Sequence, residues 1–466
     1  MTSVREEVTG AKLTRAGRVH FIGIGGAGMS AIAKVLIEQG VEVSGSDLKR
    51  SRAAVALEAM GARVHLGHAP SHVEGAGIVV VSSAIHEGNA ELQAARRAGV
   101  TIMTRGEALA HLLAGRRSIV VAGTHGKTTT TSMIVTVLAS AGIDATYLVG
   151  AGINESGTNA RYGTSDIAVA ESDESDGSFL LLSPHVAVVT NLEMDHVDFW
   201  RSQRDLEDAF ERFMAATDED GVIVVPGGGP LSRMAAHSSR RTVTFGEDGD
   251  VRIEALRPSP AGAAFTLMCG GQQADVSLPV PGRHNATNAL AAAAASLVVG
   301  IPLEEVAAGL SSYRGVERRF QMRGERSGVV VVDDYAHHPT EVKATLQAAR
   351  SAGFKRVLAV FQPHRYSRTA ALAPDFGPAF EDADRIVVTE VYGAGEDPVP
   401  GVSGKLVADA VTSALPGRPV AYLPHRDELI AYVASRARAG DGILTLGAGD
   451  ITAAADEILD HLEGRA

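Results

Sequence analysis

A glycine-rich loop at Gly123–Thr128, with the sequence GTHGKT, combines residue types that bind phosphate groups. Its glycines would let backbone N–H groups turn inward, Lys127 could reach terminal phosphates, and Thr128 could offer its hydroxyl to Mg²⁺. An apolar run ends at Val121, and residues 129–138 are expected to form the helix whose N-terminus helps hold the anion. The spacing is tighter than in the common G-x-x-x-x-G-K-T pattern, but this context favours nucleotide binding over a chance turn.

A second glycine-rich turn, Gly23–Gly28, follows the apolar run Arg18–Ile22 and precedes an expected helix at 30–39. Asp47 closes the next expected strand, which completes a dinucleotide-binding fingerprint. The turn predicts that a diphosphate binds at the helix N-terminus. A tight turn that binds no ligand is the alternative interpretation. A dehydrogenase is one interpretation, but the ATP-type loop in the same chain favours a nucleotide-linked substrate together with ATP.

Acidic and histidine side chains follow two further expected strands. Glu171 and the acidic residues after it come at the end of the strand 167–170, where a carboxylate could hold Mg²⁺. His196 follows the strand 186–190 and could complete a second metal site or position a phosphate. A solvated acidic loop and a structural histidine are the alternatives.

Two pairs of polar residues could recognise small molecules. Asn285 and Asn288 are three residues apart, so they share a helix face and could read an adenine edge, unless Asn285 caps the helix. Arg365 and Arg368 follow the expected strand Arg356–Phe361 and could bind the carboxylate of an amino acid, although surface salt bridges are the alternative.

The elements that must position these residues alternate between strands and helices, which is typical of parallel sheets with helical crossovers. We expect an α/β fold with three domains: a Rossmann-like N-terminal domain, a P-loop ATP-binding central domain and a Rossmann-like C-terminal domain. The expected limits are 1–113, 114–314 and 315–466. Residues 217–277 are expected to form short antiparallel strands and turns, without a readable functional signal. The other expected strands are at 41–44, 77–81, 118–121, 329–332, 385–389 and 442–446.

Composition limits the class of protein. The net charge of −12 lacks the basic character of a nucleic-acid binder. Cys269 is the only cysteine, and the first residues lack the apolar segment of a signal peptide, so we expect a cytoplasmic protein. The small-apolar run 289–300 is too short to span a bilayer, so no membrane insertion is expected.

The chain resembles the Mur ligase family over nearly its whole length. The phosphate loop and residues 191–196 are typical of the family as a whole. The more specific motifs are Gly23–Ser30, Glu171–Ser178, Gly315–Phe320 and Asp333–Glu341. The resemblance implies an ATP-dependent ligase that joins L-alanine to the lactyl carboxylate of UDP-N-acetylmuramate, with ATP and Mg²⁺ as cofactors, and we expect a monomer or weak homodimer.

The resemblance also implies a role for each matching residue. The UDP-sugar set is Gly25, Gly26, Gly28, Met29, Ser30, Asp47, His68, Ser82 and Arg105. The ATP set is Gly123, Thr124, His125, Gly126, Lys127, Thr128, Thr129, Asn285, Asn288, Arg319 and Asp334. The amino-acid set is Tyr335, His337, His364, Arg365 and Arg368. The metal set is Thr128, Glu171 and His196, with Glu174 as a weaker candidate, and the catalytic set is Lys127, Glu171, His196, His337 and Arg365.

Two positions depart from patterns within the family. Phe210 stands near the place where ligases that add later amino acids carry a carbamylated lysine, and its presence favours the alanine-adding branch. Ala336 replaces an expected glycine, which is tolerable only if its φ angle is negative. A ligase that attaches a whole tripeptide, a dehydrogenase and a non-catalytic nucleotide-binding protein remain alternatives.

Overall fold

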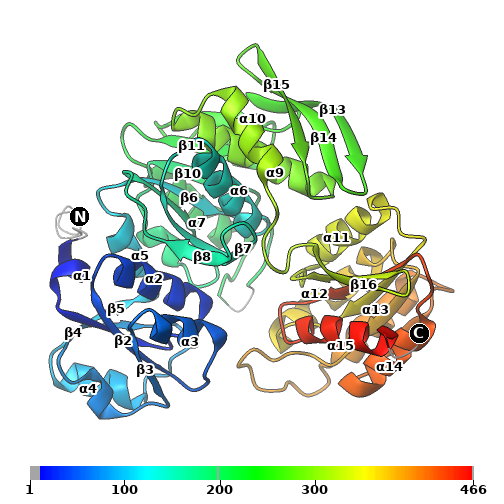
Figure 1. Ribbon diagram of the computed structural model, residues 1–466, viewed down its shortest axis with the longest axis horizontal. Coiled ribbons are helices and arrows are strands. Elements are labelled where there is room, and N and C mark those ends of the chain that lie inside the picture. The colour runs from blue at the N-terminus through cyan, green and yellow to red at the C-terminus, as the bar shows by residue number, and fades with distance from the viewer. Residues whose placement is uncertain (1–10, 197–198, 464–466) are drawn as a thin grey trace.

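A computed structural model describes residues 11–196 and 199–463 of the chain (Figure 1). Three sheets, each flanked by helices, follow one another along the sequence, with the N-terminal part drawn in blue and the C-terminal part in yellow to red. Within the described ranges, no helix has both the length and the apolar character that a membrane crossing requires.

The first sheet is parallel and five-stranded, with the order β3-β2-β1-β4-β5. This order reverses direction between β1 and β4, and the crevice at such a reversal is where open α/β sheets bind ligands. Its strands are β1 Arg18–Ile22, β2 Glu42–Asp47, β3 Arg63–Leu66, β4 Ala76–Val81 and β5 Thr101–Thr104. The helices are α1 Ala11–Arg15, α2 Ala27–Glu38, α3 Arg52–Ala59, η1 Pro70–Val73, α4 Ala90–Arg97 and α5 Arg105–Leu113.

The second sheet has ten strands in the order β15-β14-β13-β12-β11-β10-β6-β9-β7-β8. Its strands are β6 Arg117–Ala122, β7 Thr146–Ile153, β8 Thr158–Arg161, β9 Ile167–Glu171, β10 Val186–Val189, β11 Val222–Pro226, β12 Arg241–Phe245, β13 Val251–Ser259, β14 Gly262–Cys269 and β15 Gln272–Leu278. The helices are α6 Lys127–Ser140, η2 Ser178–Leu181, α7 Gln203–Ala215, α8 Pro230–Ala235, α9 Arg283–Val298 and α10 Leu303–Ser312.

The prediction of short antiparallel strands throughout 217–277 was wrong for the first half of that range. β11 pairs in parallel with β10, and β12 pairs in parallel with β11. The sequence of β11 is VIVVP, with its first four residues buried, so it extends the parallel core of the sheet. The antiparallel pairing begins at β13 and continues through β15.

The third sheet has six strands in the order β16-β17-β21-β18-β19-β20, and β16 is an antiparallel edge strand. Its strands are β16 Gln321–Arg326, β17 Val329–Asp334, β18 Arg356–Phe361, β19 Arg385–Val388, β20 Val420–Tyr422 and β21 Asp441–Leu446. The helices are α11 Pro339–Ser351, α12 Tyr366–Ala379, α13 Gly404–Ala414, α14 Arg426–Arg436 and α15 Thr452–Glu463.

The elements on either side of the phosphate loop are packed into the central core. The apolar strands β6 and β10 are buried along almost their whole length, and helix α6 is buried from Thr128 to Leu138. Helix α9, which contains the alanine-rich run, packs beside α6 and is equally enclosed. Small side chains let these two helices approach closely, so the loop between β6 and α6 is held by a packed frame.

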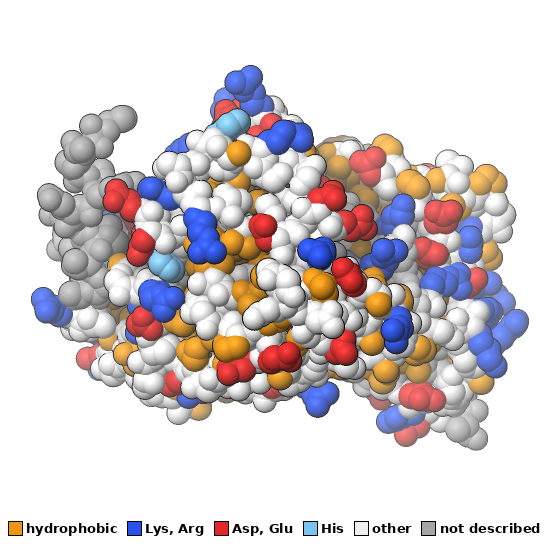
Figure 2. Space-filling model, turned by 90° about the horizontal axis from the view of Figure 1, so that it is seen from above, with side chains coloured by type: hydrophobic (Ala, Val, Ile, Leu, Met, Phe, Trp, Pro, Cys, Tyr) orange, Lys and Arg blue, Asp and Glu red, His pale blue; other side chains and the backbone are white. Residues whose placement is uncertain are grey.

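The surface carries charges of both signs. On the face shown in Figure 2, Lys and Arg side chains are interspersed with Asp and Glu side chains. The described residues form no continuous basic track on this face, in keeping with the net charge of −12.

Candidate active site

The phosphate loop lies between the end of β6 and the first residue of α6. Gly123 has a φ angle of +128°, and a Cβ there would lie 2.3 Å from Thr190 Oγ1. Gly126 has a φ angle of +79°, and a Cβ there would lie 2.4 Å from Asn288 Oδ1. Both positions therefore require glycine. The backbone N–H of His125 donates to Asn191 at 2.8 Å, which braces the loop against the next strand end.

Lys127 begins helix α6 and is held by acidic residues that follow β9. Its Nζ lies 2.8 Å from Glu174 Oε2 and 3.7 Å from Asp173 Oδ1, and it donates to the Gly123 carbonyl at 2.7 Å. Burial disfavours the ammonium charge, but Asp173 and Glu174 outweigh burial and raise the pKa of Lys127. Burial raises the pKa of Glu174 to about 7. Lys127 is therefore charged at neutral pH and placed at the loop that would hold phosphates.

The three predicted metal ligands fall into two adjacent groups. Thr128 Oγ1 donates to Glu171 Oε1 at 2.9 Å, so these two side chains meet at the loop. His196 instead lies with Asp173 and Glu174, and ligand atoms of these three residues are within 4.8 Å of one another. Hydroxyl and carboxylate oxygens are suitable ligands for Mg²⁺, so the residues present fit such an ion. Asp173 belongs to the acidic run after Glu171 that was expected to offer a carboxylate, but it was not named in the predicted metal set.

A cavity of about 240 Å³ contains most of the predicted ATP set. Among its lining residues are His125, Gly126, Thr129, Asn285, Asn288, Arg319 and Asp334. Asn285 lies within α9 and donates to the Pro281 carbonyl at 2.7 Å, whereas Gly282 occupies the N-cap. The alternative in which Asn285 caps the helix is therefore wrong.

Asp334 and Ala336 shape the segment after β17. The two carboxylate oxygens of Asp334 accept the backbone N–H groups of Phe320 and Ala336, each at 2.7 Å. Burial raises the pKa of Asp334 to about 6. Ala336 is not among the residues with positive φ, so the alanine fits its position as expected. Arg319 lies over the ring of Tyr335 at 5.2 Å, between the two cavities.

A larger cavity of about 630 Å³ contains all five residues of the predicted amino-acid set. Burial lowers the pKa of His337 to about 4 and that of His364 to about 3, so both rings are neutral near pH 7. Arg365 is the N-cap of α12, with a φ angle of +69°, and lies 3.8 Å from Glu396.

Arg368, which is expected to contact the amino acid, is also held by a protein carboxylate. Its two nitrogens donate to Asp195 at 3.0 and 3.1 Å, and both side chains are almost fully buried. This bidentate pair joins the segment after β10 to helix α12 of the third sheet. A protein carboxylate therefore already pairs with Arg368. This pairing had no local signal in the sequence, because 173 positions separate the two residues.

The residues of the predicted UDP-sugar set lie farther apart in the structure than those of the ATP set, and only some of them line a cavity. Gly28 and Arg105 line the larger cavity, and Arg105 donates to Asp176 at 3.0 Å. The other members surround the first sheet's carboxyl edge or lie beneath it. Asp47 accepts the N–H of Gly25 at 2.9 Å, and His68 contacts Ser46 and Glu91 at 3.0 and 3.1 Å.

Four further members of that set are held by their local structure. Met29 and Ser30 are buried in α2, and Ser30 Oγ donates to the Ala27 carbonyl at 3.0 Å. Gly26 is the N-cap of α2, and Ser82 follows β4, where its N–H donates to Ile22. These contacts place the residues on both sides of the reversal between β1 and β4.

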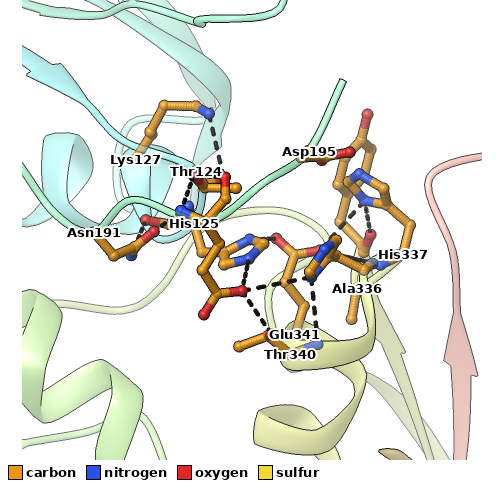
Figure 3. A network of polar contacts seen from close by, with 12 residues as sticks. Thr124, His125, Lys127, Asn191, Asp195, Ala336, His337, Thr340 and Glu341 are labelled. Atoms are coloured by element: carbon orange, nitrogen blue, oxygen red, sulfur yellow. Dashed lines mark hydrogen bonds and ion pairs between the residues drawn. The ribbon is translucent and has the colours of Figure 1, made fainter. Parts of the chain in front are cut away.

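A polar network links the phosphate loop to the third sheet, and it was not predicted. Figure 3 shows His125 and Glu341 meeting where the loop faces helix α11. His125 lies 3.2 Å from Glu193 and 3.3 Å from Glu341, and Thr340 donates to Glu193 at 2.7 Å. Burial disfavours the charged ring, but the two carboxylates outweigh burial and raise the pKa of His125 to about 9.

Sequence profiles of the Mur ligase family match three consecutive stretches of the chain. The family's catalytic domain matches residues 18–117, its middle domain residues 121–296, and its glutamate ligase domain residues 318–449. The chain belongs to the Mur ligase family. It is therefore an ATP-dependent ligase that forms amide bonds.

Several relatives of this Mur ligase share one name. The UDP-N-acetylmuramate–L-alanine ligase of Rubrobacter xylanophilus is 48% identical over 450 residues, which cover 96% of this chain and 100% of that protein. The enzyme of the same name from Pelotomaculum thermopropionicum is 46% identical over 452 residues, covering 96% and 97% of the two chains.

Solved structures agree with these sequence relationships. The crystal structure of UDP-N-acetylmuramate-alanine ligase MurC from Thermotoga maritima superposes with a TM-score of 0.81 at 30% identity, over 96% of this chain and 100% of that one. A murein peptide ligase from Psychrobacter arcticus gives a TM-score of 0.72 at 25% identity, over 96% and 99%.

Phe210 lies in the hydrophobic core of this Mur ligase. It is fully buried on α7, with its ring 5.1 Å from Phe179 in the core. A charged side chain in this position would lie among aromatic rings, so the site is structural in this chain.

Proposed function

We propose that the chain joins L-alanine to the lactyl carboxylate of UDP-N-acetylmuramate and converts ATP to ADP and phosphate. The observation that carries the proposal is the 630 Å³ cavity, which brings together residues from all three expected domains of the chain. Gly28 and Arg105 enter it from the first part of the chain, Lys127 and His196 from the second, and the amino-acid set from the third. The shared name of the relatives supports L-alanine as the amino acid.

In the proposed mechanism, the lactyl carboxylate attacks the γ-phosphate of ATP and forms an acyl phosphate. Lys127 and Arg319 neutralise the charge of the transferring group, which is the main electrostatic demand of phosphoryl transfer. Thr128, Glu171 and His196 would hold Mg²⁺, which supplies further charge neutralisation when bound. The neutral amine of L-alanine then attacks the acyl carbon, and phosphate leaves.

His337 is proposed to orient the amine. Its Nδ1 lies 3.0 Å from the Tyr335 carbonyl, which can only accept, so Nδ1 carries the ring proton. Nε2 is then the acceptor of the ring. Burial lowers the pKa of His337 to about 4, so the ring is a weak base. Nε2 accepts a hydrogen bond from the amine, and the proton that the amine loses passes on to solvent.

We propose one substrate for each of the three domains. We assign the UDP-sugar to domain 1–113, ATP to domain 114–314 and L-alanine to domain 315–466, with Arg365 as the carboxylate-binding arginine. We also propose a cytoplasmic location and a monomer or weak homodimer. The match of residues 18–117 to the Mur ligase family supports a sugar nucleotide rather than NAD at Gly23–Gly28.

Phosphate release from Mg-ATP tests the proposal. The protein would be assayed with UDP-N-acetylmuramate and, separately, with L-alanine, glycine, L-serine or an L-Ala-γ-D-Glu tripeptide, with Lys127→Met as the inactive control. Release that requires both the sugar nucleotide and L-alanine is expected. Release with the tripeptide alone would instead identify a muropeptide ligase, and no release with any amine would reject catalysis.

A further inference from the structure

Glu341 occupies the wall between the two cavities and lines both of them. It is the third residue of helix α11, only 11% of its side chain is exposed, and none of the roles assigned above uses it. Its two carboxylate oxygens face different parts of the site, which is the feature that suggests a function.

One oxygen faces the groups that would handle phosphate. Glu341 Oε1 lies 3.3 Å from His125 Nδ1 in the phosphate loop and 3.7 Å from an Arg319 nitrogen. Both neighbours carry positive charge, since His125 has a raised pKa and arginine is always protonated. Glu193 contacts the other ring nitrogen of His125, Nε2, so two carboxylates balance two cations in this network.

The other oxygen faces the amino-acid pocket. Glu341 Oε2 accepts the backbone N–H groups of His337 at 3.1 Å and His338 at 3.4 Å, and it lies 3.4 Å from the His337 ring. These bonds complete the capping box of α11 and fix the turn that carries His337. One rigid carboxylate thus contacts the phosphate loop on one side and the amine-binding histidine on the other.

We propose that Glu341 is a positioning residue that sets His337 in register with His125 and Arg319, so that the amine is aligned with the carbonyl carbon of the acyl phosphate. The inference rests on the function proposed above. It predicts that the charge of Glu341 matters for the step that uses L-alanine, beyond any role in capping the helix. Misalignment of reacting groups by about 1 Å can cost on the order of 100-fold in rate.

Glu341→Gln separates charge from capping, because glutamine also completes a capping box. We expect kcat/KM for L-alanine to fall on the order of tenfold or more, while KM for UDP-N-acetylmuramate stays unchanged. Lys343→Gln removes an exposed charge from the same helix and is the matched control, with kinetics like those of the original protein. Unchanged kcat/KM for L-alanine in Glu341→Gln would overturn the proposal.

Combination with His125→Gln tests whether the effect passes through the phosphate loop. If Glu341 acts through His125, the double variant should be about as active with L-alanine as the less active of the two single variants. Effects that multiply would contradict the proposed connection.

A measurement without catalysis separates this inference from the proposed function. The pKa of His125, followed by NMR in histidine-labelled protein, should fall in Glu341→Gln, since Glu193 would then be its remaining carboxylate and His338 its nearest ring. An unchanged pKa would reject the role of Glu341. Absence of L-alanine-dependent phosphate release in the original protein would reject only the proposed function.

Discussion

Raising the pH should loosen the contact between the phosphate loop and the C-terminal domain, because it removes the charge of His125. Contacts with Glu193 and Glu341 raise the pKa of that ring from 6.5 to about 9. At 1.36 kcal/mol per pKa unit, this difference corresponds to about 3 kcal/mol of folded-state stability. A raised pKa stabilises the fold fully below about pH 6.5, and the contribution disappears as the pH rises through about 9.

Thermal unfolding of the original protein and of His125→Gln, recorded between pH 6 and pH 10, would measure this contribution. The stability difference between the two proteins should shrink by about 3 kcal/mol over that range. For a cooperative unit of 150–250 residues this equals a change of roughly 6–12 °C in the difference between their midpoints. Histidine NMR, with the variant used to assign the resonance, should show His125 titrating near pH 9.

A stability difference that is equal at pH 6 and pH 10 would refute the reasoning. The same conclusion would follow if His125 titrated near pH 6.5, since the ring could not then be held between two carboxylates. Asn191→Ala would serve as a control, because it removes a backbone contact of His125 without touching either carboxylate.

Three other substitutions test separate parts of the structure. Arg368→Ala leaves Asp195 buried without a partner and should cost about 3–5 kcal/mol of stability in calorimetry, whereas adding Asp195→Asn should restore part of the loss. Gly126→Ala places a Cβ 2.4 Å from Asn288 at a positive φ and should weaken ATP-analogue binding in titration calorimetry roughly tenfold or more, and unchanged affinity would contradict the fitted loop. Phe210→Ala should lower stability by roughly 3–5 kcal/mol while every KM stays unchanged, and an altered KM would place Phe210 in the site.

The fold was largely predictable because its main strands are short apolar runs. Strands β1 and β18 begin and end at the predicted residues, Arg18–Ile22 and Arg356–Phe361. Edge elements were harder: β16 has the sequence QMRGER and is largely accessible, so its pattern carries little apolar signal. The parallel strand β11 was hidden by the polar, glycine-rich sequence around it.

The candidate site was predictable where chemistry follows local sequence. The phosphate loop carries its function in six consecutive residues, and Asn285 and Asn288 share one helix face within the smaller cavity. Partners across domains carried no such signal. The Asp195–Arg368 pair and the contact between His125 and Glu341 join residues far apart in the chain, and they depend on how the sheets pack together.

The wall between the two cavities has a consequence for inhibitors. His125, Gly126, Arg319 and Glu341 line both cavities. A compound that filled both spaces would press on these residues from two directions at once. A substitution that weakened the binding of such a compound would also disturb the contact between the proposed phosphate and amine sites. Resistance substitutions in this wall are therefore expected to lower the activity of the enzyme.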